Sequence, residues 1–142
     1  MRSTFPVAIH LFFFYEEKIL LLRRFNTGYE DGKYSVVAGH LDAGETVTQA
    51  AIREANEEIG VILMPQDLQV VHVINRKSED ERIDFFMRVK RWTGEIRNNE
   101  PDKCDQLAWF AVEALPTNII PYVKHAIQSY NRGGYYSEFG WP

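Results

Sequence analysis

The chain has 142 residues, enough for one domain with a hydrophobic core, and we expect a single domain over residues 1–142. Apolar residues make up 45% of the chain and charged residues 25%, as in soluble globular proteins, and the net charge of −4 gives no indication of nucleic-acid or membrane-surface binding. Cys104 is the only cysteine, so the chain cannot form an internal disulfide, and we expect a cytoplasmic protein.

The first apolar stretches predict a hairpin. Val7 to Phe14 and Ile19 to Phe25 are rich in β-branched and aromatic residues, and the polar residues YEEK separate them. Glu16 to Lys18 interrupts the apolar run after about ten residues, which is too short to span a bilayer. No small-residue cleavage site follows, so we expect neither a signal peptide nor a membrane anchor.

The next segment predicts a loop, a strand and a helix. Asn26 to Tyr34 contains two glycines and is expected to be a loop, followed by a short strand from Tyr34 to Ala38. Thr46 and Gln49 have the spacing of a capping box, which predicts the start of a helix. Gly60 is placed to end that helix.

The remaining elements complete an α+β pattern. Gln69 to Asn75 and Ile83 to Trp92 are predicted strands separated by a charged turn, and Leu107 to Val112 is a further strand. Ile119 to Tyr130 has apolar residues at helical spacing. The fold class expected from these elements is α+β, with a mixed sheet and one or two helices on its faces.

The helix after Thr46 has an unusual concentration of negative charge. Glu54, Glu57 and Glu58 occupy an arc of about 100° that borders the apolar stripe of the helix. Each like-charge pair costs a few tenths of a kcal/mol, of which Arg53 can offset a part through an i,i+4 pair with Glu57. A divalent cation such as Mg²⁺ or Mn²⁺ would offset the remainder, since both prefer carboxylate and carbonyl oxygens. Spacing alone leaves open the alternative of a solvated acidic face.

The stretch GHLDAGETVTQAAIREANEEIGV, residues 39–61, resembles the Nudix box of the Nudix hydrolase superfamily. All charged and glycine positions of the box are filled. Ala55 stands where the family usually has a bulkier aliphatic residue, and His40 stands where many members have a second glycine. The resemblance implies an α/β/α sandwich around a mixed β-sheet. It also implies hydrolysis of a nucleoside diphosphate linked to another moiety, with Mg²⁺ or Mn²⁺ as cofactor.

The resemblance also implies roles for individual residues. Arg53 would orient the carboxylates by ion pairing and Glu45 would brace the loop before the helix, while Glu57 and Glu58 would serve catalysis as well as metal binding. The implied metal ligands are the carboxylates of Glu54, Glu57 and Glu58 and the carbonyl oxygen of Gly39.

A general base is expected outside the box. Glu100 lies in NNEPDKCDQLAWF, a segment that resembles the loop that supplies an extra carboxylate in MutT-like members. Glu95 and Asp102 are the alternatives, and Glu100 as an exposed loop acid without a catalytic role is equally compatible with the sequence.

Three polar residues are candidates for substrate binding. Arg23 and Arg24 end the second predicted strand beside a glycine-containing loop, a position suited to phosphate contacts, although strand alternation allows only one to face a cleft. A solvated strand end is the alternative. By the resemblance, Asn118 would bind a purine edge. The aromatic residues near it are more typical of a core than of a base-stacking surface; they are Trp109, Phe110 and Tyr122.

The expected reaction is hydrolysis of a purine nucleoside triphosphate, unmodified or modified, to the monophosphate and pyrophosphate. The alternatives are hydrolysis of a nucleotide sugar or other diphosphate derivative, and a catalytically silent nucleotide sensor. The four histidines lack the paired spacing of a zinc site; they are His10, His40, His72 and His125. The expected partner is a small nucleotide, and the sequence leaves homodimer formation open.

Overall fold

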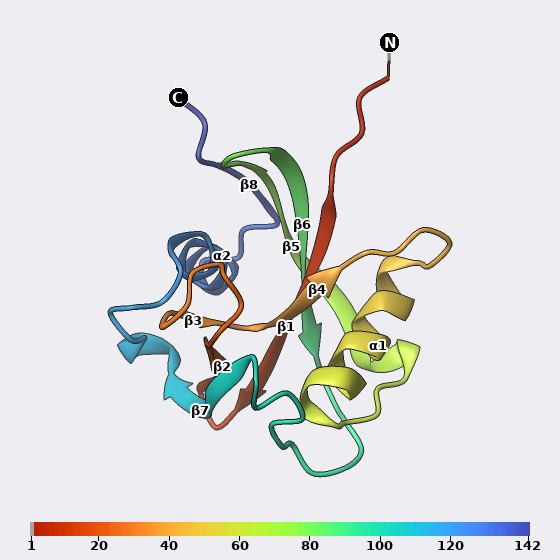
Figure 1. The fold of residues 1–142 in the computed structure, drawn as a ribbon, viewed down its shortest axis with the longest axis vertical. Helices are drawn as coiled ribbons and strands as arrows, with labels where there is room; N and C mark the ends of the chain where they lie inside the picture. The colour runs from red at the N-terminus through yellow and green to blue at the C-terminus, as the bar shows by residue number, and fades with distance from the viewer. Residues whose placement is uncertain (1) are drawn as a thin grey trace.

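The computed structural model describes residues 2–142, and its strands form one connected sheet system (Figure 1). The strands are β1 (Val7–Tyr15), β2 (Lys18–Arg24), β3 (Tyr34–Ser35), β4 (Val37–His40), β5 (Leu68–Lys77), β6 (Glu81–Val89), β7 (Cys104–Ala111) and β8 (Tyr136–Phe139). The helices are α1 (Val47–Ile59) and α2 (Pro121–Asn131), with short 3₁₀ turns η1 (Pro65–Asp67) and η2 (Val112–Ala114).

The sheet is mixed because its strands pair in both directions. β1 pairs in parallel with β6 and antiparallel with β4, β5 pairs antiparallel with β6, and β8 pairs in parallel with β5. β2 pairs with β1 only beside their turn and then continues between β3 and β7. β1 therefore connects the two parts of the sheet and lies at the centre of the molecule.

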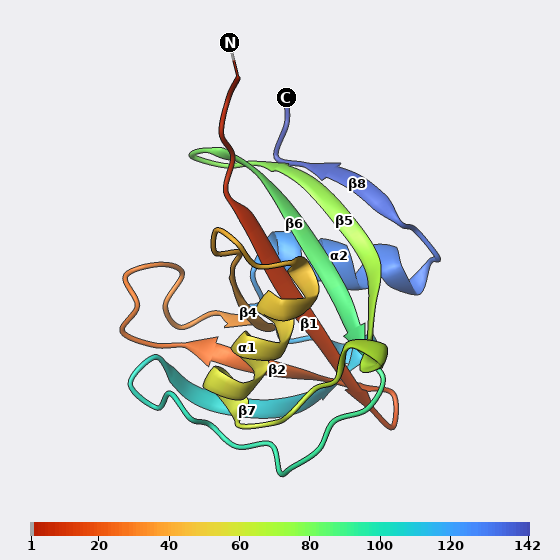
Figure 2. The same cartoon turned by 90° about the vertical axis from the view of Figure 1, so that its right-hand side faces the viewer.

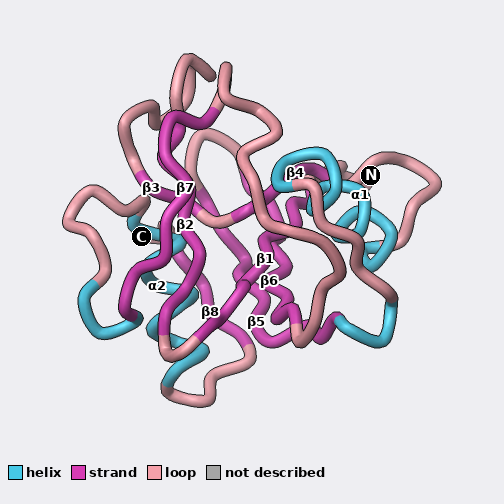
Figure 3. The backbone as a smooth tube through the Cα atoms, turned by 90° about the horizontal axis from the view of Figure 1, so that it is seen from below, coloured by secondary structure: helices cyan, strands magenta, loops and turns pink. Residues whose placement is uncertain are grey.

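The two helices cover opposite faces of the sheet around β1 and β6 (Figures 2 and 3). Each helix closes its own hydrophobic cluster: alanines and Ile59 of α1 pack on one face, and Val123, Ala126 and Ile127 of α2 pack on the other. This is the α/β/α sandwich that the resemblance implies, so the expected fold class is confirmed. Neither helix, nor any other in residues 2–142, is long and apolar enough to cross a membrane.

Most predicted elements are present with ends shifted by a few residues. The hairpin of β1 and β2 turns at Glu16 and Glu17, whose φ angles are 48° and 64°. Positive φ at both central residues is typical of a type I′ turn, whose twist matches that of the two strands. Pro121 is the first residue of α2, two residues after the predicted start, as suits a residue that lacks a backbone donor.

The prediction of one strand from Tyr34 to Ala38 is wrong. The segment divides at Val36 into β3, which pairs with β2, and β4, which pairs with β1. β1 and β2 pair with each other only beside their turn, so each has backbone groups left to pair with a part of this segment. β8 was not predicted at all, because YSEF alternates weakly and its pairing with β5 comes from residues far away in the sequence.

Candidate active site

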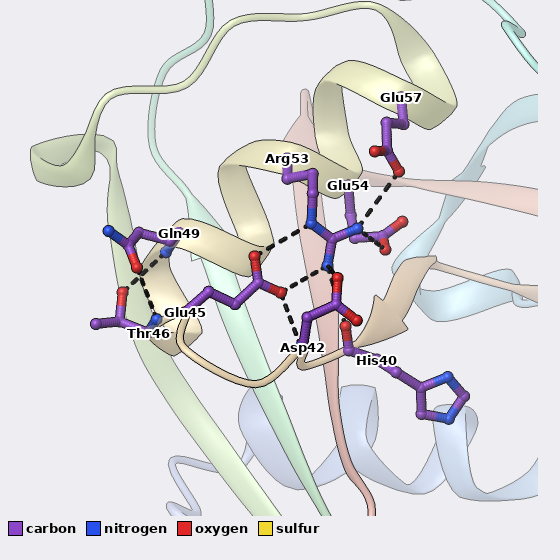
Figure 4. Close-up of polar contacts among 8 residues, drawn as sticks. All are labelled: His40, Asp42, Glu45, Thr46, Gln49, Arg53, Glu54 and Glu57. Atoms are coloured by element: carbon purple, nitrogen blue, oxygen red, sulfur yellow. Dashed lines mark hydrogen bonds and ion pairs between the residues drawn. The ribbon is translucent and has the colours of Figure 1, made fainter.

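The capping box places α1 at a fixed position after the loop that follows β4. The Thr46 hydroxyl accepts a hydrogen bond from the Gln49 N–H at 3.1 Å, and the Gln49 side chain accepts one from the Thr46 N–H at 2.8 Å (Figure 4). Gly60 ends the helix in the left-handed conformation with φ of 75°. Both predicted helix ends are confirmed, and the box residues between them lie on one helix packed against β4.

Gly39 allows a close approach between β4 and α1. A side chain at this position would overlap with the carboxyl group of Glu54 and would force that carboxyl to move. β4 is held in place by antiparallel pairing with β1, in which Gly39 lies opposite Ile9. The backbone of Gly39 and the Glu54 carboxylate, both predicted metal ligands, are therefore in contact.

Arg53 organises the acidic residues of the box (Figure 4). Its guanidinium lies 2.7 Å from the carboxylate of Glu45, 2.7 Å from that of Glu54 and 3.4 Å from that of Glu57. It also donates a hydrogen bond of 3.1 Å to the carbonyl oxygen of His40. It also lies 3.4 Å from the carboxylate of Asp42, so one guanidinium links four carboxylates of the loop and helix to the end of β4.

Glu45 braces the loop between β4 and α1. Its carboxylate accepts hydrogen bonds from Arg53 and, at 2.9 Å, from the backbone N–H of Asp42. These bonds hold the pKa of Glu45 below its ordinary value, with the Arg53 bond as the largest cause. Glu45 therefore remains a carboxylate that fixes both the loop and the Arg53 side chain.

Glu58 carries the strongest sign that the site is built for a cation. Burial raises the pKa of its carboxyl well above the ordinary value, and the adjacent Glu54 and the nearby Glu100 raise it further. Its Oε2 atom is enclosed and has no hydrogen-bond partner within residues 2–142. A buried acceptor without a donor beside a second carboxylate fits a hard divalent cation, so the predicted ligands suit Mg²⁺ or Mn²⁺.

The carboxylates do not yet converge as a ligand cage. In the described part of the chain, no three His, Cys, Asp or Glu side chains come close enough together to hold a metal ion. The ion pairs of Arg53 with Glu54 and Glu57 account for this, because they direct those carboxylates toward the guanidinium. A cation bound at these oxygens would compete with Arg53 for them.

Glu100 lies beside the box, as predicted for a base outside it. Burial raises the pKa of Glu100, and the neighbouring charges of Glu54, Asp102 and Glu57 add to this while Lys103 opposes it. The two alternative bases, Glu95 and Asp102, are both exposed. Of the three candidates, Glu100 is therefore the one whose half-buried carboxyl the box carboxylates influence.

The predicted substrate contacts lie around the loop between β2 and β3. Arg23 forms an ion pair with Asp105 at 2.7 Å and lies 5.9 Å from the centre of the Tyr34 ring. Arg24 donates to the carbonyl oxygen of Tyr29 at 2.7 Å and to the Thr27 hydroxyl at 3.0 Å. In this structure Arg24 therefore supports the loop itself.

Asn118 supports the same loop from the other side, by a 2.9 Å hydrogen bond from its amide to the carbonyl oxygen of Gly32. Its backbone carbonyl accepts a bond from the N–H of Tyr34. Tyr122 is buried, and Trp109 and Phe110 pack partly buried against the two hydrophobic clusters. The expectation that these aromatic residues belong to the core agrees with this packing.

A surface hollow of about 750 Å³ lies elsewhere. It is on the α2 side, between the β1–β2 turn and the end of α2, and its lining includes Phe14, Arg88 and Tyr130. None of the predicted site residues lines it. The chemistry of the carboxylates, and not the size of a hollow, therefore locates the candidate site.

Comparison with known proteins identifies the family. The NUDIX domain matches residues 4–130, which is most of the chain. The chain belongs to the NUDIX family. The resemblance of residues 39–61 to the Nudix box is therefore confirmed, and the capped helix with its arginine and glutamates is the box of a NUDIX domain.

The names of two similar proteins state different activities. The NAD-capped RNA hydrolase NudC of Pseudomonas aeruginosa is 32% identical over 100 residues, which are 70% of this chain but only 34% of NudC. The chain thus spans about a third of that relative's length. The 8-oxo-dGTP diphosphatase of Escherichia coli is 29% identical over 105 residues, 73% of this chain and 78% of that protein.

Solved structures agree on the fold. The MutT NUDIX hydrolase of Burkholderia pseudomallei has a TM-score of 0.81 and 25% identity, with 89% of this chain and 98% of that chain aligned. The ORF135 protein of E. coli has a TM-score of 0.76 at 18% identity, with 90% and 89% of the two chains aligned. The second likeness concerns the fold alone.

Proposed function

We propose that this NUDIX protein is a hydrolase that cleaves a phosphoanhydride bond in a nucleoside diphosphate derivative, with Mg²⁺ or Mn²⁺ as cofactor. The observation that carries the proposal is the pair of Glu54 and Glu58 beside Gly39, in which Oε2 of Glu58 is buried. Two neighbouring carboxylates, one with a buried oxygen that lacks a partner, are costly in a stable fold unless a cation joins them.

The chain's own residues divide the work of hydrolysis. Glu54, Glu57, Glu58 and the Gly39 carbonyl oxygen would hold the cation, which when bound lowers the pKa of a water ligand and neutralises phosphate charge. Arg53 and Glu45 keep the helix and the loop in register. Glu100 would accept a proton from the attacking water, because a carboxyl with a raised pKa is a better base near neutral pH.

The proposed substrate is a purine nucleoside triphosphate, unmodified or modified, that is converted to the monophosphate and pyrophosphate. The similarity to 8-oxo-dGTP diphosphatase and to a MutT NUDIX hydrolase supports this choice. Arg23 and Arg24 are the proposed phosphate contacts and Asn118 is the proposed contact to the base. Arg23 and Arg24 lie where β2 enters the loop before β3, and Asn118 is hydrogen-bonded to Gly32 in that loop.

The proposal is tested with a substrate panel in the presence of Mg²⁺. The panel contains unmodified and oxidised nucleoside triphosphates, nucleotide sugars, dinucleoside polyphosphates and NAD-capped RNA, and the products are identified by chromatography. Release of a monophosphate and pyrophosphate from a triphosphate supports the proposal. Turnover of nucleotide sugars alone would assign the alternative activity.

Glu58→Gln tests the metal assignment. This variant keeps the shape of the side chain but removes its charge, and we expect a loss of kcat by a factor of about 10² or more. Glu79→Gln, the same change in the exposed turn between β5 and β6, is the control and should retain full activity. Unchanged Mg²⁺-dependent turnover in Glu58→Gln would refute the assignment.

A catalytically silent nucleotide sensor is the alternative from another class. Thermal unfolding with metal alone and with added nucleotides distinguishes it from an enzyme, because a bound ligand raises the unfolding midpoint whether or not turnover occurs. Stabilisation by nucleotides without product formation for any member of the panel would favour the sensor.

A further inference from the structure

The segment 95–103 that carries Glu100 is attached to the C-terminal end of α1. The N–H of Arg97 donates to the carbonyl oxygen of Ile59 and the N–H of Asn99 donates to that of Glu58, both at 3.0 Å. The last carbonyls of a helix have no partner within it, and this segment satisfies two of them. Glu58 therefore contributes its carboxyl to the site and its carbonyl to the segment that brings Glu100 there.

Gly60 makes this attachment possible. Its φ of 75° turns the chain away from α1. A Cβ atom at this position would lie 3.0 Å from the side-chain Nδ2 of Asn99 and 3.1 Å from the side-chain Nε of Arg97. The glycine that ends the helix thus also leaves room for the segment that returns to it.

Asn98 fixes the backbone of Glu100 within that segment. Its Oδ1 accepts a 3.0 Å hydrogen bond from the N–H of Glu100, and its Nδ2 donates a 2.6 Å bond to the carbonyl oxygen of Cys104 at the start of β7. The carbonyl oxygen of Glu100 accepts bonds from the N–H groups of Lys103 and Cys104, each at 2.9 Å. Both backbone groups of Glu100 are therefore held, and one half-buried amide side chain joins them to the sheet.

We propose that Asn98 is a positioning residue for hydrolysis and acts through Glu100, whose backbone it holds next to the end of α1 that carries Glu57 and Glu58. The inference rests on the proposed function, because it requires Glu100 to take part in turnover. Within residues 2–142 the hydrogen bonds of the Asn98 side chain go to Cys104 and Glu100, and none goes to the box carboxylates or to the predicted substrate residues, so its effect should appear in kcat and not in substrate binding.

The expected effect follows from the cost of misplacing a catalytic group. Asn98→Ala removes both side-chain hydrogen bonds, and a displacement of about 1 Å can reduce the rate by up to about 100-fold. We expect kcat to fall by about 10- to 100-fold, with KM changed by less than about threefold. Asn98→Ser keeps an oxygen that can accept from the Glu100 N–H, as serine does in comparable turns, and should recover part of the loss.

A double-mutant cycle provides the test, with kcat and KM measured for the wild type, Asn98→Ala, Glu100→Gln and the double variant. If Asn98 acts through Glu100, Asn98→Ala lowers kcat in the wild type but causes little further loss when Glu100 is already glutamine. A purely structural role would give the same fold-loss in both backgrounds. Asn131→Ala, at the exposed end of α2, is the matched control and should leave kcat unchanged.

The outcomes separate this inference from the proposed function. Absence of turnover by the wild type on the whole substrate panel would refute the proposed function. Three results with an active wild type would overturn the inference and leave the function standing. They are equal losses of kcat in both backgrounds, an effect of Asn98→Ala on KM alone, and an unchanged kcat in Glu100→Gln. If Asn98→Ala does not fold, as judged by circular dichroism, the same cycle with Asn98→Ser decides the question.

Discussion

At the scale of single residues, the candidate site depends on one position without a side chain and one side chain with many partners. Gly39 lets the Glu54 carboxyl lie against β4, and Arg53 links Glu45, Glu54 and Glu57. Charge alone explains neither residue. Gly39 acts because it leaves space, and Arg53 acts because its guanidinium is a planar, forked donor.

Gly39→Ala is expected to weaken cation binding. The added methyl group would displace the Glu54 carboxyl, so we expect the affinity for Mn²⁺ to fall by about 10- to 100-fold, as when the support of a metal ligand is lost. Isothermal titration with Mn²⁺ measures the affinity, and thermal unfolding confirms that the variant is folded. A folded variant with wild-type affinity would contradict the assignment of this position.

Arg53→Lys is expected to reduce activity although it keeps the positive charge. Arg53 reaches Glu45, Glu54 and the His40 carbonyl with three separate nitrogens, Nε, Nη1 and Nη2, whose positions the single nitrogen of lysine cannot reproduce, so we expect kcat to fall by about tenfold or more. Arg82→Lys is the matched control, because Arg82 pairs with Asp80 at an exposed turn. If Arg53→Lys and Arg82→Lys had equal kcat values, a positive charge at position 53 would be enough for activity and the forked guanidinium would not be needed.

At the scale of elements, α1 is placed by its ends as much as by its packing. Thr46 and Gln49 satisfy each other's backbone donors at the first turn, and Gly60 allows the last carbonyls to bind segment 95–103. The helix is thus fastened to the loop before it and to the segment after it. These attachments hold the box carboxylates and Glu100 in one place.

Thr46→Ala tests the helix start. Loss of the cap leaves backbone donors of the first turn without a partner, and the free energy of unfolding should fall by about 0.5–2 kcal/mol. Thr48→Ala, two residues further along, makes the same chemical change inside the helix and should have little effect or stabilise, because alanine has the higher helix propensity. Urea unfolding of both variants gives the comparison. Equal losses would mean that the hydroxyl of Thr46 does not act as a cap.

At the scale of the whole molecule, a buried polar network lies in the face of the sheet that α2 covers. Asp84 bonds to His10 at 3.0 Å and to Arg76 at 2.7 Å, and Arg76 lies over the ring of Tyr122 at 3.6 Å. His10 stacks on Phe86 and is enclosed by the sheet and α2. The network therefore joins β1, β5 and β6 to α2.

This network predicts a loss of stability in mild acid. Burial lowers the pKa of His10 below 6.5, Asp84 opposes this, and Arg76 and His40 add to it. The unfolded chain therefore binds a proton at a higher pH than the folded chain, so stability is complete above about pH 6.5 and falls as the pH drops below it. The pKa of Asp84 is lowered by its bonds to His10 and Arg76 against the effect of burial, so its contribution is lost only below about pH 4.

Urea unfolding between pH 7 and pH 5 measures the His10 effect. Glu58 and Glu100 oppose this effect, because their raised pKa values stabilise the folded state as the pH falls. The change in the free energy of unfolding between pH 7 and pH 5 should therefore be less destabilising in His10→Gln than in the wild type. Part of the slope should remain, because burial and the neighbouring His72 and Arg132 lower the pKa of His125 as well. A slope identical to that of the wild type would show that His10 does not titrate in this range on folding.

The sequence by itself predicted the helix that carries the box, both of its ends and most strands. Those signals are local: a capping box, a terminal glycine and runs of β-branched residues act within a few positions of one another. The NUDIX family could also be recognised from residues 39–61 alone, because their spacing on one helix fixes which carboxylates share a face.

Only the tertiary structure decided the rest. The division of residues 34–40 into β3 and β4, and the pairing of β8 with β5, depend on which distant strands have free backbone groups. The tertiary structure also decided the contact of Gly39 with Glu54, the burial of the Glu58 oxygen, and the two hydrogen bonds by which Asn98 joins Glu100 to Cys104. Sequence spacing determines which residues lie on the same face of a helix, but burial and long-range hydrogen bonds arise only when that face meets the sheet and the segment that follows it.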